Sequence, residues 1–120
     1  MRPDIIGECV PKSKAFHTNT QLPDYEQYRR LFNGYAIPLA FVDLDLLGEN
    51  AQEIARRANG KRIRIATKSV RCVTVLKRIL EHSSSFQGLM SYSAAEAVFL
   101  SQHGFDDILV AYPTWNELQI

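Results

Sequence analysis

Residues 62–69, with the sequence Arg-Ile-Arg-Ile-Ala-Thr-Lys-Ser, begin with alternating polar and apolar side chains, are rich in β-branched residues and bring a lysine close to a stretch with a helical pattern. Such alternation predicts a strand. In parallel α/β folds, side chains at the carboxyl ends of strands face the crevice where ligands bind. Lys68 stands at that end and is our candidate for the functional centre. A lysine at a strand end is also often a solvated surface residue, so spacing alone leaves both interpretations open.

The chemistry available to such a lysine follows from its surroundings. Burial disfavours the charged ammonium, so a lysine in a desolvated pocket loses its proton more readily than one in water. The neutral amine can attack a carbonyl carbon and form a Schiff base with an aldehyde cofactor. Lys68 is therefore a candidate catalytic and cofactor-binding residue.

The composition is that of a small globular protein. The chain has 120 residues, of which 46% are hydrophobic and 22% charged, enough for one small core and unlike a disordered or collagen-like chain. The 14 basic and 13 acidic residues leave a formal net charge of +1. Because so small a charge creates no long-range field for nucleic acid or anionic membranes, we expect neither as a partner. A small molecule or another protein fits better.

The chain has no pattern of a targeted or membrane-spanning protein. Residues 1–7 contain no apolar run of the signal-peptide type, and no stretch approaches the ~20 apolar residues of a membrane span. We therefore expect a cytoplasmic protein. Cys9 and Cys72 lie far apart in the sequence and have no metal-binding spacing, which favours free thiols in a reducing compartment.

The pattern of the amino-terminal region predicts a segment separate from the rest of the chain. Residues 1–22 show no periodicity, and we predict an irregular lead-in over residues 1–35 that contains one short helix. Asp24 can cap this helix at its start, and Asn33-Gly34 can end it because these residue types readily adopt the left-handed conformation.

Two carboxylates precede the first long helical pattern. Residues 38–45 form a mostly apolar run that predicts a strand, with Asp43 and Asp45 on one face of it. Two carboxylates at this spacing fit a catalytic or metal-binding pair, and they also fit structural hydrogen bonding or salt bridging. No third ligand is near, so we assign no metal site.

Strand and helix patterns alternate from about residue 38 to the end of the chain. Besides residues 38–45, strands are expected at 62–69, 86–92 and 106–112, and helices at about 47–58, 73–81, 93–102 and from 115. Short connections make this a parallel α/β arrangement of βα units. No glycine-rich nucleotide motif follows a strand. We predict that residues 36–120 form the first part of a TIM-type (β/α)8 barrel, because a whole barrel needs about 250 residues. This hypothesis treats the chain as a fragment.

Several short motifs occur in an order that resembles a known family. They are Val42-Asp43-Leu44-Asp45 with Asn50, then Arg64 and Lys68, then Glu96-Ala97, then Ala111-Tyr112-Pro113. Over roughly residues 36–115 they resemble the amino-terminal part of the alanine racemase-like (fold type III) pyridoxal-phosphate enzymes. The branch of D-threonine aldolases and D-serine dehydratases is the nearer match.

The resemblance implies roles for three residues. Lys68 matches the lysine that holds pyridoxal 5'-phosphate as a Schiff base. Arg64 is expected on the same strand face as Lys68, where it could lower the pKa of the lysine or hold a carboxylate; packing, or a salt bridge to Asp43 or Asp45, fits equally. Tyr112 could line the cofactor pocket or simply pack in the core. Residues 93–96, Ser-Ala-Ala-Glu, have the form of a helix capping box, which explains Glu96, so we assign Glu96 no chemical role.

The chain also departs from the family. Related enzymes usually carry histidines two residues before and two after the lysine, where this sequence has Ala66 and Val70. The resemblance therefore implies the amino-terminal part of a pyridoxal-phosphate-dependent amino-acid aldolase, racemase or dehydratase, with an amino acid as the small-molecule substrate. The 120 residues alone are expected to be inactive. The alternative is a non-catalytic cofactor-binding domain, or a structural half-barrel that associates with itself as a homodimer or with a partner.

Overall fold

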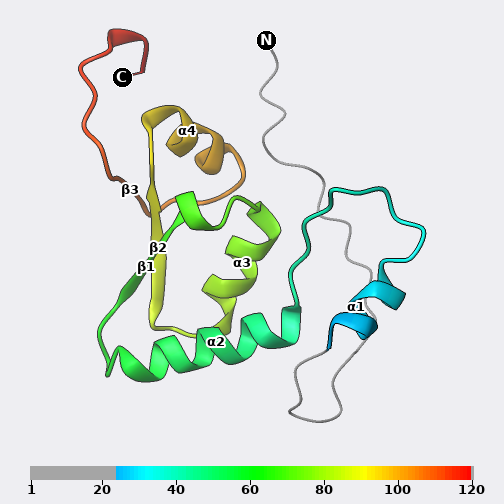
Figure 1. The fold of residues 1–120 in the computed structure, drawn as a ribbon. Helices are drawn as coiled ribbons and strands as arrows, with labels where there is room; N and C mark the ends of the chain where they lie inside the picture. Colours follow the sequence, from blue (N-terminus) through cyan, green and yellow to red (C-terminus); the bar gives the residue numbers. More distant parts are fainter. Residues whose placement is uncertain (1–23, 120) are drawn as a thin grey trace.

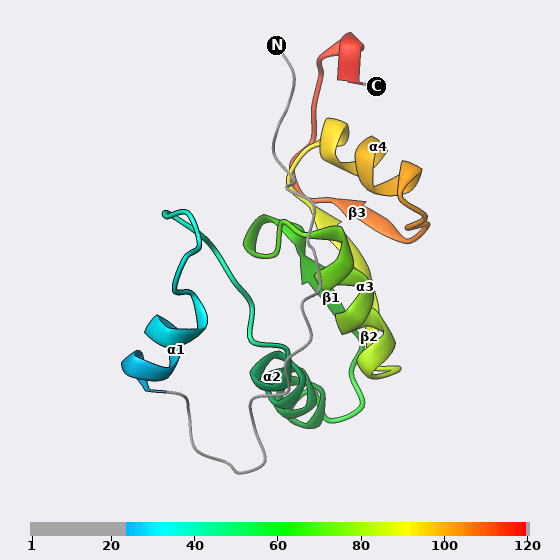
Figure 2. The same cartoon turned by 90° about the vertical axis from the view of Figure 1, so that its right-hand side faces the viewer.

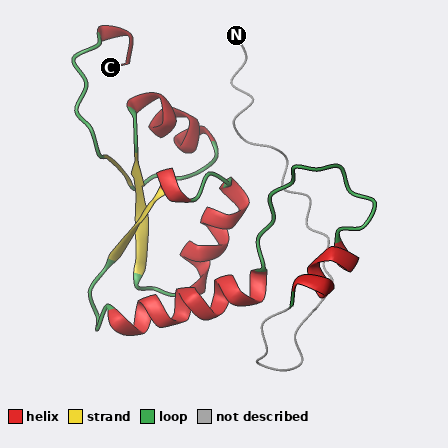
Figure 3. Ribbon diagram, viewed as in Figure 1, coloured by secondary structure: helices red, strands yellow, loops and turns green. Residues whose placement is uncertain are grey.

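The computed structural model describes residues 24–119 (Figure 1). Helix and strand alternate along most of this range, as the sequence predicted (Figure 3). The helices are α1 (Tyr25–Leu31), α2 (Leu44–Arg57), α3 (Val73–His82) and α4 (Ala94–Gln102), with short 3-10 helices at Thr67–Ser69 and Glu117–Gln119. Of the lead-in that we predicted for residues 1–35, residues 1–23 lie outside the described residues, and α1 is the short helix expected in it.

The centre of the fold is a three-stranded parallel sheet. Its strands are β1 (Ile63–Ala66), β2 (Phe86–Ser91) and β3 (Ile108–Val110), in the order β1-β2-β3. Each connection between neighbouring strands runs through one helix, α3 or α4, because parallel strands need a long crossover. The prediction of an α/β fold with a parallel sheet is confirmed.

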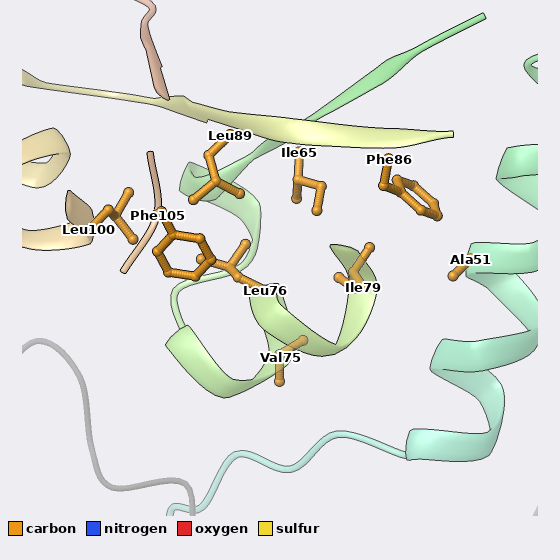
Figure 4. Close-up of a cluster of buried hydrophobic side chains, with 9 residues drawn as sticks. All are labelled: Ala51, Ile65, Val75, Leu76, Ile79, Phe86, Leu89, Leu100 and Phe105. Carbon is orange, nitrogen blue, oxygen red and sulfur yellow. The ribbon is translucent and has the colours of Figure 1, made fainter. Parts of the chain in front are cut away.

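One face of the sheet carries the hydrophobic core. Side chains from the strands point toward α3 in Figure 4, and α4 and α2 add one residue each. The buried set is Ala51, Ile65, Val75, Leu76, Ile79, Phe86, Leu89, Leu100 and Phe105. Leu89 and Leu76 are 0% and 2% exposed, so the contact between β2 and α3 is the centre of the core.

The ends of α1 and α4 follow from their sequences. Asp24 caps α1 by accepting a hydrogen bond of 2.8 Å from the Gln27 N–H, and the Gln27 side chain accepts one from the Asp24 N–H. Ser93 caps α4 by accepting from the Glu96 N–H, while the Glu96 carboxylate accepts from the N–H of Tyr92 rather than of Ser93. Each cap satisfies backbone donors that have no partner inside the helix. Both predicted caps are confirmed.

The strand that we predicted for residues 38–45 is wrong. Residues 39–43 have no regular secondary structure, and α2 begins at Leu44. The reason is Asp43, whose Oδ1 accepts hydrogen bonds from the N–H groups of Asp45 (3.1 Å) and Leu46 (3.0 Å) and so starts the helix. Asp45 lies in the first turn, where a carboxylate is favoured by the helix dipole. Asp43 and Asp45 therefore do not share a strand face.

The first strand of the sheet is shorter than its alternating sequence suggests. It ends at Ala66, and the next three residues form a 3-10 turn that contains Lys68. At the end of the described range, the predicted helix from Trp115 is only a 3-10 turn at Glu117–Gln119.

The segment before α2 has its own small cluster of rings. Phe32, the C-cap residue of α1, packs against Tyr28, Tyr35 and Phe41, with centroid distances between 4.6 and 6.4 Å. Figure 2 shows α1 to one side of the sheet, with α2 at its base. None of the residues of α1 is buried, so this cluster is separate from the core.

Candidate functional site

The carboxyl edge of the sheet gathers the residues that follow the three strands. The turn Thr67–Ser69 follows β1, Tyr92 follows β2, and Ala111 and Tyr112 follow β3. Parallel strands bring these positions to one edge, as the sequence predicted for Lys68 and Tyr112. Tyr92 was missed, because the sequence marks it only as the last residue of a strand run.

Lys68 lies exposed on this edge within a well-anchored turn. The preceding Thr67 is 1% exposed, and its hydroxyl donates a hydrogen bond of 3.3 Å to the carbonyl oxygen of Met90 in β2. After the turn, the Val70 N–H donates to the Thr67 carbonyl at 2.9 Å, and the Val70 side chain packs against the core. The backbone of Lys68 is therefore fixed on both sides while its side chain faces outward.

Two tyrosines form an aromatic pair on the same edge. The rings of Tyr92 and Tyr112 lie 5.1 Å apart with an interplanar angle of 59°, and the residues are 49% and 56% exposed. The Tyr92 N–H donates a hydrogen bond of 2.7 Å to the Glu96 carboxylate, which ties this residue to the first turn of α4. Tyr112 is thus part of an exposed ring pair and is not a core residue.

Arg64 lies below the edge, on the face of the sheet opposite the core. Its Nη1 atom is 2.7 Å from Asp107 Oδ1, just before β3, and it also donates to the carbonyl oxygens of Leu89 and Asp107 at 3.4 Å. To make these contacts the side chain crosses β2 over Gly88. The salt bridge to Asp43 or Asp45 that we considered is wrong, because the acidic partner is Asp107.

The Arg64–Asp107 pair belongs to a short polar network. Asp107 Oδ2 accepts a hydrogen bond of 3.2 Å from Gln87 Nε2, and the Gln87 side-chain oxygen accepts one of 3.0 Å from Arg62. Hydrogen bonds from Arg64 first, and from Gln87 second, hold the pKa of Asp107 below its ordinary value. Arg64 is therefore positioned by a carboxylate rather than free to turn toward the edge.

Between this network and the edge lies an apolar row. Ala66 pairs with Met90, and Met90 pairs with Leu109, so one side chain from each strand stands at the same level. Alternation along the strands directs them to the face opposite Ile65 and Leu89. Leu109 is 51% exposed. The non-core face is thus layered, with a charged level, an apolar level and then the level of Lys68 and Tyr92.

Ser91, at the end of β2, has an unusual hydroxyl. The residue is 0% exposed, and its Oγ atom has no hydrogen-bond partner among the described residues. Buried polar groups nearly always have a partner, so this position departs from the norm. Ser91 alternates with Met90 and therefore faces the helix layer rather than the face with Arg64.

A metal site or a membrane span would each leave a recognisable feature among residues 24–119. In that range no three histidine, cysteine, aspartate or glutamate side chains come together as a metal ion would require. No helix there has both the length and the apolar character needed to cross a bilayer. Comparison of the chain with protein-family models, with curated proteins and with solved structures found no match. The residues at the carboxyl edge of the sheet are therefore what indicates a function.

Proposed function

We propose that this chain is the amino-terminal part of a pyridoxal-phosphate-dependent enzyme that acts on amino acids, as an aldolase, a racemase or a dehydratase. In this proposal Lys68 carries the cofactor. The observation that supports it most is the position of Lys68, which is exposed in an anchored turn at the carboxyl edge of a parallel sheet. The residues that resemble the family's motifs around it support the same assignment.

The layered face of the sheet supports the barrel part of the proposal. In a (β/α)8 barrel the helices cover the outside, inward-pointing side chains stack in levels, and the active site lies at the carboxyl ends of the strands. Here α3 and α4 pack against the sheet face that carries Ile65 and Leu89. The opposite face carries the charged level of Arg64 and Asp107 and then the apolar row Ala66–Met90–Leu109. We infer that the three strands are the first part of such a barrel and that the layered face is its interior.

The residues at the edge fit a flat, carbonyl-bearing cofactor. The Lys68 amine is accessible, and the rings of Tyr92 and Tyr112 offer apolar surface on the same edge. In this proposal the Tyr112 ring borders the cofactor. The Tyr92 ring extends the same apolar surface because it contacts the Tyr112 ring. Arg64 adds a positive charge two levels below the edge, where Asp107 fixes its guanidinium.

The chemistry is divided between the cofactor and the protein. When bound, pyridoxal phosphate supplies an electron sink for negative charge that develops at the Cα atom of an amino acid. Lys68 Nζ would hold the cofactor, and when free of it the neutral amine would accept a proton from the substrate and, as the ammonium, give it back. The anchored turn fixes the backbone from which the Lys68 side chain extends, which limits the positions that this nitrogen can reach.

Two positions at which the related enzymes usually carry histidines limit the proton chemistry available to this site. Ala66 is the last residue of β1 and part of the apolar row, and Val70 packs against the core. No imidazole can act from either place. Proton transfer therefore falls to Lys68 or to residues outside the described range, and the choice between aldolase, racemase and dehydratase stays open.

Binding of pyridoxal phosphate to the purified chain tests the proposal. Addition of the cofactor should produce the absorption band of a lysine-bound aldehyde, and Lys68→Ala should remove it. Lys77→Ala is the matched control, because Lys77 is also exposed but lies on α3, with its Nζ 5.7 Å from the centre of the Phe105 ring. A band that survives Lys68→Ala, or that Lys77→Ala removes equally, would disprove the role of Lys68.

A further inference from the structure

Two Asn-Gly pairs follow helices in this chain. Asn33-Gly34 comes after α1, and Asn59-Gly60 comes after α2. All four residues are exposed, and within residues 24–119 neither glycine N–H donates a hydrogen bond to a backbone carbonyl. A Cβ atom added at either glycine would meet nothing within 4 Å. Both glycine nitrogens are therefore open to approach by the side chain of the preceding asparagine.

An asparagine followed by a glycine can lose its side-chain amide without an enzyme. The backbone nitrogen of the glycine gives up its proton to a base in the solvent and forms a bond to the asparagine Cγ atom. The Cγ–Nδ2 bond then breaks, and Nδ2 takes up a proton and leaves as ammonia. One water molecule opens the resulting cyclic imide at either of its carbonyls, which yields aspartate or iso-aspartate. Glycine favours the first step because no Cβ atom stands beside the attacking nitrogen.

The rate of this reaction depends on how easily the turn opens. The imide ring fixes the torsion of the asparagine about its Cα–C bond, so a turn held in another conformation reacts slowly. Local opening costs little free energy where few apolar groups are buried. Both Asn-Gly pairs offer the same reacting atoms, so the surrounding fold decides which pair reacts faster.

The Asn59-Gly60 turn joins two elements of the core. α2, before the turn, contributes the buried Ala51, and β1, after it, begins with Ile63, which packs against the core. Hydrogen bonds of 3.2 Å from the Asn59 N–H and of 3.0 Å from the Lys61 N–H to carbonyls of the preceding turn hold its backbone. Opening this turn would disturb the packing of both elements.

The Asn33-Gly34 turn lies in the segment outside the core. None of the residues of α1 is buried, and Figure 2 shows this helix to one side of the sheet. The hydrogen bonds from the Asn33 N–H (3.4 Å) and the Tyr35 N–H (3.1 Å) are both longer than their counterparts after α2. Opening this turn costs only the contacts of its own segment, chiefly the packing of the Phe32 and Tyr35 rings.

From these observations we propose that Asn33 is a site of spontaneous deamidation, and that the native fold directs this modification to Asn33 in preference to Asn59. The substrate is the side-chain amide of Asn33 itself, and water is the only co-reactant. This modification needs no cofactor, so the role of Lys68 and the modification of Asn33 can each fail without the other.

Incubation of the full chain at mildly alkaline pH, followed by peptide mass spectrometry, tests this proposal. Asn33 should be converted faster than Asn59 by about tenfold or more, because its turn opens at lower cost. Iso-aspartate, detected with an enzyme that methylates it, should appear at Asn33 first. In urea that unfolds the chain, the two sites should react at similar rates, since the fold no longer distinguishes them.

Asn33→Gln and Asn59→Gln form a matched pair of variants. A glutamine closes the corresponding, larger ring much less readily than an asparagine does. Asn33→Gln should therefore remove most of the early loss of ammonia from the native chain, while Asn59→Gln should leave it nearly unchanged. Urea unfolding of both variants shows that each still folds.

Modification at Asn33 should also loosen the end of α1. The product has an additional negative charge, by which ion exchange separates it from the unmodified chain. In its iso-aspartyl form the backbone between Phe32 and Tyr35 is longer, so the two rings, 6.0 Å apart, lose their packing. Trypsin should cut this form faster after Arg30, in the last turn of α1, and at an unchanged rate after Arg57, in the last turn of α2.

Three results would overturn the proposal. They are equal rates at Asn33 and Asn59 in the native chain, a faster reaction at Asn59, and a preference for Asn33 that is as large in urea as in the native chain. A native chain that keeps Asn33 intact while the unfolded chain loses it would also contradict the proposal. Equal cutting after Arg30 in the two forms would show that the modification leaves α1 unchanged.

Discussion

Substitution of Gly88 by alanine should destabilise the sheet where Arg64 crosses it. Gly88 has a φ of +62°, a left-handed conformation that side chains with a Cβ atom rarely adopt. A Cβ atom added there would lie 2.6 Å from Asp107 Cγ and 2.7 Å from Arg64 Nη1, and would also collide with the Asp107 carbonyl oxygen. The variant therefore meets both a backbone cost and a steric cost.

The size of the effect follows from these two costs. The left-handed conformation costs a residue with a Cβ atom about 1–2 kcal/mol, and overpacking costs about 1–3 kcal/mol. The reduced freedom of the unfolded alanine chain returns about 0.4–1 kcal/mol. We expect a net loss of about 1–4.5 kcal/mol in the free energy of unfolding, to be compared with the 5–15 kcal/mol typical of a native protein.

The free energies of unfolding of Gly88→Ala and Gly104→Ala, both measured in urea, separate the backbone cost from the steric cost. Gly104 has a φ of +88° with nothing within 4 Å of an added Cβ atom, so its variant has only the backbone cost. Gly88→Ala should therefore be the more destabilised by about 1–3 kcal/mol, the steric share. Equal losses in the two variants would refute the close crossing of Arg64 over Gly88.

Two further predictions concern the helices. Asp43→Ala removes the cap of α2 and should lower the free energy of unfolding by about 1 kcal/mol, measured by urea unfolding, while Asp45→Asn, which keeps the cap, should cost less. Glu53, bound by Arg56 and Arg57, has its pKa lowered to about 2 from an ordinary 4.5, so its contribution to stability is present above about pH 4.5 and is lost as the pH falls toward 2. Glu53→Gln should flatten the acid side of a thermal unfolding profile over that interval, and an unchanged profile would show that this ion pair adds nothing.

The sequence predicted the sheet well because its signals were local. Alternation gave β1, the runs around Phe86 and Ile108 gave β2 and β3, and helical spacing gave α3 and α4. Asn59, with a φ of +49°, and Gly60, with a φ of +80°, follow the C-cap of α2, where left-handed residues of these types commonly end a helix. These features depend on neighbours in the chain and need no tertiary information.

The error at residues 38–45 shows where local signals compete. An apolar run and a capping aspartate overlap there, and periodicity favoured a strand that includes Asp43. In the fold the carboxylate of Asp43 satisfies the first N–H groups of α2, while Phe41 and Val42 stay 50% exposed. The cap by Asp43 therefore outweighed the apolar pattern, because none of residues 38–45 is buried by the part of the chain that the structure describes.

The contacts of the site depended on tertiary structure. Arg64 and Asp107 are 43 residues apart, and they meet because Gly88 leaves space on the strand between them. No spacing rule predicts such a pair. Tyr92 could have been found from the sequence, since it follows β2 as Tyr112 follows β3, and strands of one parallel sheet end at the same edge.

Covalent trapping of the cofactor tests the role of Lys68 most directly. The full chain is incubated with pyridoxal phosphate, reduced with borohydride and digested, and the labelled peptides are identified by mass spectrometry. We predict that Lys68 carries the label at cofactor concentrations where the other four lysines of the chain stay unmodified. Labelling spread evenly over all the lysines, or absent from Lys68, would contradict the proposed function.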